Sequence, residues 1–347
     1  MLWRDVGFFG RDVVNTTTEE PSSSSSSSSV DVPLVAGGWS FTAVVSTTDA
    51  SLTLRDFATR PAIVDERLRL ATAVSCSRDR AFVVTSDGWV LTAYADGASG
   101  TKWTKLEGVE NITSACAASH CHDAVVIVDA SGRAVEVRGL DDATGPSTRE
   151  ASLAPGGDAR VRSVALGAKH GVFVDVNGGC WTFGWNAYGT CGLGFASAED
   201  IETPTRVESF ARANVRAVSA SCGDAFTVFV AASGDAYACG YNGDGQLGTE
   251  DCPVGEATAI PVLVDLERVV VARCGARHCA AVADRRLFLW GANDLGQMGV
   301  GSDVMSHRVR PRACAVDVVA VAVGVHHVSL LRSADAAAGA EYVRAHV

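Results

Sequence analysis

The sequence has no long apolar run and no export signal. No stretch approaches the roughly 18 consecutive apolar residues that a membrane-spanning helix requires. The first ten residues, MLWRDVGFFG, place acidic Asp5 where a signal peptide would need a basic flank followed by an apolar stretch. We therefore expect a soluble chain that is not secreted, has no contact with a membrane and resides in the nucleus or the cytoplasm.

Closely spaced cysteine pairs and clusters of basic residues are also missing. The eleven cysteines include no CxxC pair, and without an export signal we expect reduced, mostly buried thiols. Acidic residues outnumber basic ones 40 to 29, which gives a formal net charge of −11. Because nucleic-acid binding relies on clustered Lys and Arg, we expect no direct nucleic-acid partner. A basic protein partner is electrostatically easier.

Sequence signatures of catalysis are lacking as well. The chain has no HExxH, GxSxG, P-loop or paired-carboxylate motif. Gly243, Gly245 and Gly248 spell GxGxxG, but a dinucleotide site also needs a helix N-terminus inside a βαβ unit. Sister loops at Gly184 and Gly291 share the wider pattern without the middle glycine, so repeat geometry explains these glycines. We expect neither an enzyme nor a cofactor.

Glycine, in contrast, is abundant and recurs in register. The 35 glycines are about 10% of the chain, against a usual share of about 7%. Seven segments share a small first residue, an apolar run after the fourth position, and a turn residue eight positions beyond that fourth position. They begin, at separations of 39 to 56 residues, at Gly38, Ser77, Cys121, Gly167, Gly223, Gly275 and Gly324.

The length and apolar pattern of the repeat predict one four-stranded blade. Four strands with their turns use about 40 to 50 residues. The runs 125–128 and 226–232 are short, almost continuously apolar, and rich in β-branched and aromatic residues, which is typical of strands buried on both faces. Sheets packed side by side in a ring supply that environment. We therefore predict an all-β fold, a seven-bladed β-propeller.

A second pattern, GxNxxGxxG, follows in three repeats and begins at Gly184, Gly240 and Gly291. Since glycine and asparagine accept positive φ, the pattern predicts a compact loop between strands. The alternation of GxxH, an apolar strand and WGxNxxGQLG resembles the regulator-of-chromosome-condensation repeat family, and this resemblance implies a seven-bladed propeller. Residues 159–316 carry both motifs, whereas residues 32–155 carry only the first.

The last repeat needs strands from elsewhere, because only 23 residues follow Gly324 and none forms a WGxNxxG segment. LWRDVGFFGRDV at 2–13 is a degraded version of that segment. We expect residues 1–14 to complete the last blade, the Ser-rich residues 15–31 to form a flexible loop, residues 32–335 to form the propeller, and 336–347 to be a tail. The subgroup described as regulator-of-chromosome-condensation domain-containing protein one is similar in this arrangement, and WSFTA at 39–43 fits it.

Histidine recurs at the fourth position of three repeats, as His170, His278 and His327. A catalytic histidine is typically singular, so we expect these to be hydrogen-bonded packing residues. Structural zinc needs four ligands in complementary pairs, and no convincing pairing exists between the two nearest clusters. We therefore expect no metal site at His120, Cys121 and His122 or at Cys274, His278 and Cys279.

The function that these patterns favour is presentation of loops on a rigid ring. We expect a monomeric, non-enzymatic protein–protein interaction scaffold, and the family resemblance implies a partner related to chromatin or signalling. The alternative is guanine-nucleotide exchange on a Ran-like small GTPase, the activity of the family's best-known member. Exposed loop aromatics make good interface anchors, and the candidate partner-binding residues are Trp185, Tyr188, Tyr241, Asp244, Asp294 and Leu295.

Overall fold

The computed structural model describes residues 33–55, 63–94, 103–117, 124–138, 140, 147–150, 160–298 and 308–332. Antiparallel strands dominate these residues, in agreement with the predicted all-β class. Two short helices connect strands, the 3-10 helix η1 (Glu66–Leu70) and the α-helix α1 (Glu208–Arg212).

Each sheet is an antiparallel meander in which strands that follow one another along the chain are neighbours. A two-stranded sheet pairs β25 (Val318–Val323) with β26 (Val328–Arg332). The six four-stranded sheets are, in chain order, β1 (Leu34–Gly37), β2 (Thr42–Ser46), β3 (Ser51–Arg55) and β4 (Ile63–Val64); β5 (Ala71–Cys76), β6 (Arg80–Thr85), β7 (Val90–Tyr94) and β8 (Thr104–Lys105); β9 (Ile112–Cys116), β10 (Ala124–Asp129), β11 (Ala134–Arg138) and β12 (Ser147–Glu150); β13 (Val161–Leu166), β14 (His170–Asp175), β15 (Cys180–Asn186) and β16 (Ser197–Arg206); β17 (Ala217–Cys222), β18 (Phe226–Ala231), β19 (Ala236–Tyr241) and β20 (Ala257–Leu263); β21 (Val269–Cys274), β22 (His278–Ala283), β23 (Arg286–Gly291) and β24 (Arg308–Val316).

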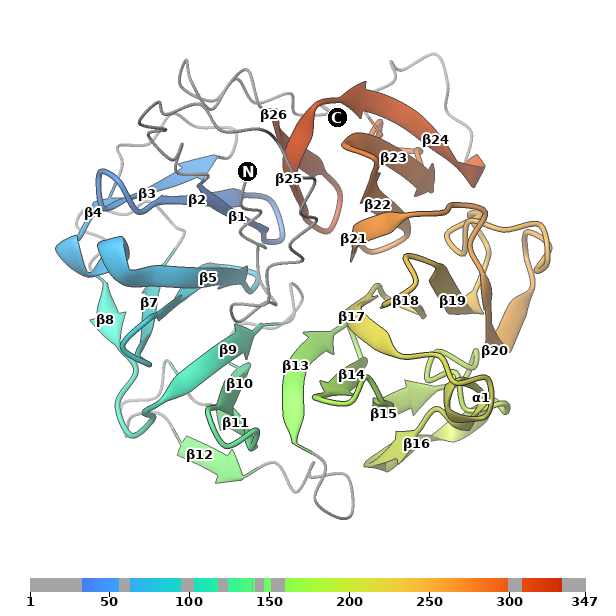
Figure 1. The fold of residues 1–347 in the computed structure, drawn as a ribbon, viewed down its shortest axis with the longest axis horizontal. Coiled ribbons are helices and arrows are strands. Elements are labelled where there is room, and N and C mark those ends of the chain that lie inside the picture. The colour runs from blue at the N-terminus through green and yellow to red at the C-terminus, as the bar shows by residue number, and fades with distance from the viewer. Residues whose placement is uncertain are drawn as a thin grey trace, which may run out of the picture.

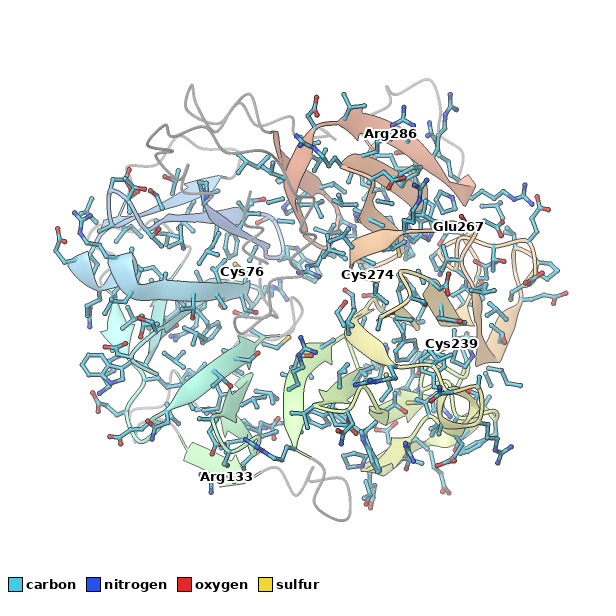
Figure 2. All side chains as sticks on the ribbon, viewed as in Figure 1. Cys76, Arg133, Cys239, Glu267, Cys274 and Arg286 are labelled. Atoms are coloured by element: carbon cyan, nitrogen blue, oxygen red, sulfur yellow. The ribbon has the colours of Figure 1, made fainter. Side chains whose placement is uncertain are left out.

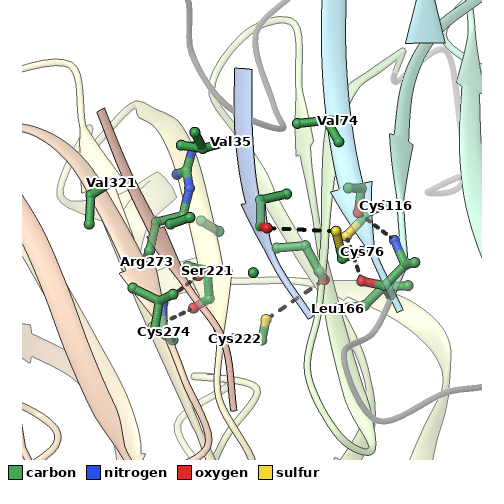
Figure 3. A pocket seen from close by; sticks show the side chains of 18 residues that line it. Val35, Val74, Cys76, Cys116, Leu166, Ser221, Cys222, Arg273, Cys274 and Val321 are labelled. Atoms are coloured by element: carbon green, nitrogen blue, oxygen red, sulfur yellow. Dashed lines mark hydrogen bonds between the residues drawn. The ribbon is translucent and has the colours of Figure 1, made fainter. Parts of the chain in front are cut away.

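The sheets are arranged around a central axis, with the first strand of each sheet innermost (Figure 1). A central channel of about 100 Å³ is lined by residues of β1, β5, β9, β13, β17, β21 and β25 (Figure 3). Cys76 and Cys274 lie beside this channel, whereas Arg133 and Arg286 lie toward the rim of the ring (Figure 2). The fold is therefore a β-propeller, and its inner strands come from every sheet.

The prediction of seven complete blades needs correction. The described residues form six blades of four strands, and the sheet of β25 and β26 has two. The N-terminal segment 1–14 that was expected to complete it lies outside the described residues, as do residues 15–31, 336–347 and 120–122.

The burial of the strands follows their position in the blade. Every residue of β6, β14, β18 and β22 is buried, because each of these second strands is covered on both faces by neighbouring sheets. The outermost strand β16 instead has the sequence SAEDIETPTR and is mostly exposed. The continuously apolar runs of the sequence thus correspond to the second strands, as the pattern predicted.

A polar contact between neighbouring sheets uses the repeated histidine. The Nε2 of His170, at the start of β14, lies 2.9 Å from the hydroxyl of Thr227 in β18. That hydroxyl donates to the carbonyl of Thr190, 2.8 Å away in the loop of the preceding blade. Because the Thr227 hydroxyl donates to Thr190, it accepts from the Nε2 of His170, so the hydroxyl is satisfied inside the seam, whereas the buried Nδ1 of His170 has no partner among the described residues.

The same contact closes the ring between the last sheet and the first. The Nε2 of His327 lies 3.0 Å from the hydroxyl of Thr42, 285 positions away in the chain, and that hydroxyl also lies 2.8 Å from the Ser329 hydroxyl. A Cβ on Gly37 would come within 2.4 Å of the Val323 carbonyl group, so glycine permits the close approach of the two inner strands. Residues of β1, β2, β25 and β26 also share one apolar cluster.

His278 occupies the same repeat position but lacks this partner. Its two ring nitrogens are buried and make no hydrogen bond within the described part of the chain. In the repeat register, the position of Thr227 and Thr42 is taken in the next sheet by Val328, which has no hydroxyl. One seam of the propeller is therefore weaker than its equivalents.

This contact predicts opposite effects of two reciprocal substitutions. Thr227→Val removes the hydroxyl partner of the His170 Nε2 and leaves the Thr190 carbonyl with only the weak thiol donor of Cys239, so it should lower the free energy of unfolding by about 1–3 kcal/mol. Val328→Thr supplies a hydroxyl to His278 and should raise it by about 1 kcal/mol. Urea unfolding of both variants measures the difference. A destabilisation of similar size in both variants would contradict the proposed role of the contact.

Candidate interaction face

The two repeated motifs lie at the same edge of each blade. The GxxH turn joins the first and second strands, and the GxNxxGxxG loop joins the third and fourth. In an antiparallel meander such alternate connections emerge on the same side. We call this side the loop face and define it by the turns 167–170, 223–226 and 275–278 and by the motif loops 184–196, 240–256 and 291–298.

The asparagine of each loop holds the loop from inside. Asn186, Asn242 and Asn293 are buried, and the side-chain oxygen of each accepts a hydrogen bond of 3.0 Å from the backbone N–H five residues later. The backbone at Gly240 and Gly245 has φ of 106° and 76°, which side chains other than glycine rarely adopt. The predicted compact loop is confirmed.

Three of the predicted partner-binding residues form an aromatic array across two blades. The ring of Tyr188 lies 5.4 Å from that of Trp185 and 4.9 Å from that of Tyr241, measured between centroids. Tyr188 is 42% exposed. The ammonium group of Lys169 lies 5.6 Å from the Trp185 ring, within the range of a cation–π contact.

The acidic candidates are brought together by a residue of the neighbouring turn. Arg277 lies 3.1 Å from a carboxylate oxygen of Asp244 and also pairs with Asp294, so it joins the loops of two adjacent blades. Burial opposes the charge on Asp294, but hydrogen bonds from Gln297 and Arg277 outweigh it and lower the pKa of this carboxyl group. Leu295, the sixth candidate, is 37% exposed beside this pair.

Sequence reasoning missed the two basic residues of this face. Lys169 and Arg277 each stand directly before the repeated histidine, in the turns GAKH and GARH. Their shared position in the repeat, one residue before the histidine, is the signal that could have identified them. The structure thus places all six predicted residues on the loop face of three consecutive blades, together with these two cations.

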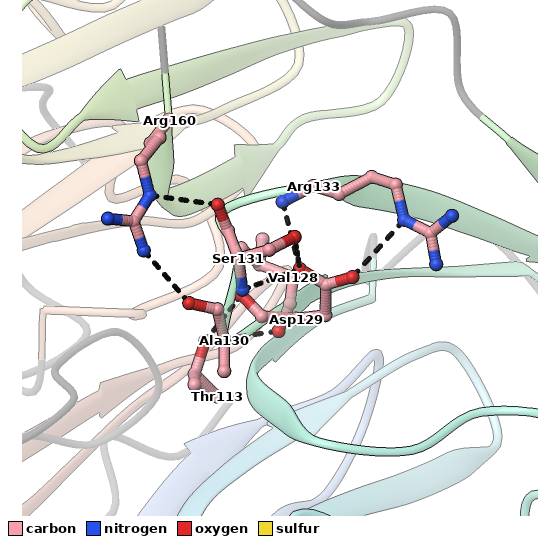
Figure 4. Close-up of polar contacts among 7 residues, drawn as sticks. All are labelled: Thr113, Val128, Asp129, Ala130, Ser131, Arg133 and Arg160. Atoms are coloured by element: carbon pink, nitrogen blue, oxygen red, sulfur yellow. Dashed lines mark hydrogen bonds and ion pairs between the residues drawn. The ribbon is translucent and has the colours of Figure 1, made fainter. Parts of the chain in front are cut away.

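The opposite face uses its polar groups to hold turns and seams. Asp129 accepts backbone hydrogen bonds from Ser131 (2.9 Å) and Arg133 (3.0 Å), which closes the turn between β10 and β11. Arg160, from the segment before the next blade, donates to the carbonyls of Ser131 and Ala130 (Figure 4). Arg216 reaches the carbonyl of Asn177 in the next seam in the same way. These side chains are engaged within the fold, and so the loop face is the better candidate for binding.

The recurring histidines are packing residues by position. His170, His278 and His327 are all buried, and the hydrogen bonds of His170 and His327 across the seams confirm the predicted role for these two. Burial disfavours the protonated ring and lowers the pKa of His170 to about 4. Burial and the neighbouring His327 lower the pKa of His278 to about 3.

No geometry of a cofactor or metal site accompanies these residues. Across the described ranges, no group of three His, Cys, Asp or Glu side chains is placed to hold a metal ion. Gly243, Gly245 and Gly248 lie between two antiparallel strands, β19 and β20, and not in a βαβ unit. No helix among the described residues combines the length and apolar character needed to cross a membrane.

The low pKa of His170 predicts a pH dependence of stability. In the unfolded chain a histidine has a pKa near 6.5. Between pH 6.5 and about 4 the unfolded state binds a proton that native His170 does not bind. The free energy of unfolding is therefore highest above pH 6.5 and falls by about 3 kcal/mol from this residue as the pH falls to about 4.

Urea unfolding at a series of pH values measures this loss. In His170→Phe, which copies the phenylalanine at this repeat position in Phe41 and Phe226, the pH-dependent loss should shrink. An unchanged pH dependence in the variant would show that His170 is not the group responsible.

Comparison with known proteins agrees with the repeat geometry. A sequence model of the Regulator of chromosome condensation (RCC1) repeat matches residues 177–230, 233–282 and 284–331, and a second model of the same repeat matches 217–246. Each of the three long segments covers the last two strands of one sheet and the first two strands of the next, β15–β18, β19–β22 and β23–β26.

Two relatives share sequence with part of the chain. The chain is 32% identical over 168 residues to the Ultraviolet-B receptor UVR8 of Arabidopsis thaliana, and the match covers 48% of this chain and 37% of the receptor. It is 33% identical over 139 residues to the X-linked retinitis pigmentosa GTPase regulator of Homo sapiens, covering 40% of this chain and 13% of that protein. The match thus spans well under half the length of either relative.

A solved structure shares the fold over most of the chain. The crystal structure of Prp20p from Saccharomyces cerevisiae superposes with a TM-score of 0.69 and 16% identity, over 88% of this chain and 84% of that one. At this identity the likeness concerns the fold alone. Together, the motif loops, the ring of sheets and the sequence matches identify a β-propeller chain that carries repeats of the regulator-of-chromosome-condensation family, three of them across residues 177–331.

Proposed function

We propose that this chain is a non-enzymatic interaction scaffold of the regulator-of-chromosome-condensation repeat type, which binds a protein partner through its loop face. The observation that carries the proposal is that two groups of contacting side chains lie on the loop face of three consecutive blades. One group joins Lys169, Trp185, Tyr188 and Tyr241, and the other joins Asp244, Arg277 and Asp294.

The side chains of these two groups are of the kind that binds another protein. The aromatic rings and Leu295 offer apolar area that a partner can cover, and such anchors carry much of the affinity of protein interfaces. Lys169 and Arg277 balance the charges of Asp244 and Asp294, so the two groups together have no excess of positive charge for a phosphate backbone. We infer a protein partner and no direct binding of nucleic acid.

The loops are held in place before any partner binds. The buried side chains of Asn186, Asn242 and Asn293 bond the backbone inside the loops. The side-chain oxygens of Gln246 and Gln297 accept hydrogen bonds from the amides of Asp244 and Leu295, at 2.7 and 2.9 Å. A preorganised surface loses little conformational entropy on binding.

The comparisons support two classes of partner without deciding between them. Prp20p, whose fold is similar, has binding properties toward Gsp1p and histones, and one sequence relative is a GTPase regulator. We propose a chromatin protein or a small GTPase as the partner of a monomeric chain in the nucleus or the cytoplasm. Membership of the single-propeller subgroup stays a prediction.

The loop-face proposal predicts which exposed side chains matter for binding. Tyr188→Ala and Leu295→Ala should each weaken the binding of a captured partner about tenfold or more, because truncating a central anchor costs over about 1.4 kcal/mol of binding free energy. Leu70→Ala and Leu263→Ala are matched controls at exposed positions outside the loop face, 44% and 50% exposed.

Affinity capture with the intact chain, followed by titration of the recovered partner against all four variants, makes the measurement. Unchanged binding by Tyr188→Ala and Leu295→Ala, or an equal loss in the controls, would refute the assignment of the face.

Guanine-nucleotide exchange is the second candidate, favoured by the likeness to Prp20p and to a GTPase regulator. An exchange factor opens the nucleotide pocket of its GTPase without a covalent step of its own. The rate of release of labelled GDP from a purified Ran-like GTPase, with and without this chain, separates the two functions. The scaffold proposal predicts no acceleration, and a saturable acceleration would replace it with the exchange function.

We also propose that residues 1–14 complete a seventh blade on the sheet of β25 and β26. The support is that this sheet has two strands where the six others have four, while its β25 lines the same channel. Deletion of residues 2–14 should lower the midpoint of thermal unfolding and raise amide exchange in β26. A deletion variant with wild-type stability and wild-type exchange in β26 would exclude this closure.

A further inference from the structure

Two thiols face each other at the end of a hairpin near the central channel. Cys274 is the last residue of β21 and pairs in register with Cys279 of β22, and their sulfur atoms are 3.6 Å apart. The Gly275 N–H donates to the His278 carbonyl at 2.8 Å, so Cys274 and Cys279 form a non-hydrogen-bonded pair. In such pairs the Cα atoms lie about 4.5 Å apart, within the range that a disulfide spans.

The equivalent positions of other blades do not pair two cysteines. Cys222 is opposite Thr227, Cys76 is opposite Ala81, and Leu166 is opposite Gly171. The hairpin of β21 and β22 thus combines the channel-side cysteine seen in other blades with a second cysteine at the position that holds Thr227 in the preceding blade.

The two sulfur atoms differ in their access to solvent. Cys274 is only partly buried and lines the channel (Figure 3), whereas Cys279 is fully buried and donates to the carbonyl of Gln246. Burial and the adjacent thiol raise the pKa of Cys279 far above its ordinary value, which keeps it protonated. A channel of about 100 Å³ admits molecules of the size of water or hydrogen peroxide.

We propose that Cys274 and Cys279 are a modification site, at which a small peroxide entering the channel joins the two thiols in a reversible disulfide between β21 and β22. The site is independent of the proposed partner, because its chemistry resides in the two thiols. The turn that the disulfide would close, 275–278, also carries Arg277 of the loop face.

The reaction balances with hydrogen peroxide as the oxidant. The Cys274 sulfur attacks one peroxide oxygen and gives up its proton, the O–O bond breaks, and the other hydroxyl group leaves with that proton as water, which yields a sulfenic acid on Cys274. The Cys279 sulfur then attacks the Cys274 sulfur, the S–O bond breaks, and the hydroxyl group leaves as water with the Cys279 proton. Two electrons pass from the thiols to the peroxide, and a dithiol reductant reverses the change.

Mass spectrometry of the full chain tests the site directly. Trypsin cleaves after Arg273, Arg277 and Arg285, so the two cysteines fall into separate peptides, CGAR and HCAAVADR. After treatment with hydrogen peroxide and blocking of free thiols, we expect these peptides to be linked and to separate again after reduction with dithiothreitol. Cys274→Ser and Cys279→Ser should abolish the linked species, and the matched control Cys222→Ser should retain it.

Two results would overturn the proposal. One is a wild-type chain in which CGAR and HCAAVADR stay unlinked while peroxide oxidises other cysteines or leaves all thiols free. The other is a reaction of Cys274 with oxidised glutathione that is as fast as disulfide formation by peroxide. Oxidised glutathione is too large for the channel, so its reaction would show that Cys274 is reached by another route.

Discussion

The structure depends on the contact between neighbouring sheets, since a four-stranded blade that is apolar on both faces cannot be stable alone. Apolar packing supplies the buried area, and a histidine-to-hydroxyl contact adds a polar link between sheets at some of the seams. His170 with Thr227 and His327 with Thr42 show this contact at two seams, one of them the seam that joins the last sheet to the first. Where Val328 replaces the hydroxyl, the ring nitrogens of His278 have no hydrogen-bond partner within the described ranges.

The same motifs that build the seams also build the surface for binding. In each loop the buried asparagine side chain bonds the backbone, and glycines at positive φ set its path, whereas Tyr188 and Leu295 are exposed. Tyr188 and Leu295 can therefore vary in chemistry without disturbing the loop. This division explains why repeats of one geometry can serve different partners, and why the fold alone does not name the partner here.

Much of the fold could be predicted from the sequence. The repeat at Gly167, Gly223 and Gly275 gives the length of one blade, and the continuous apolar runs identify the strands that are buried on both faces. The contacts of Tyr188 with Tyr241 and of Arg277 with Asp244 could not be predicted, since each joins residues of different repeats whose separation is set by the ring. The prediction of seven full blades went beyond the described residues, where the sheet of β25 and β26 has two strands.

A double-mutant cycle between Thr42 and His327 tests the central claim most directly. The two side chains are 285 positions apart in sequence and meet only if the sheets close into a ring. Unfolding of Thr42→Val, His327→Phe and the double variant should give a coupling energy of about 1 kcal/mol or more. Single effects that add to within about 0.3 kcal/mol would show that the two residues do not interact and would contradict the closed ring.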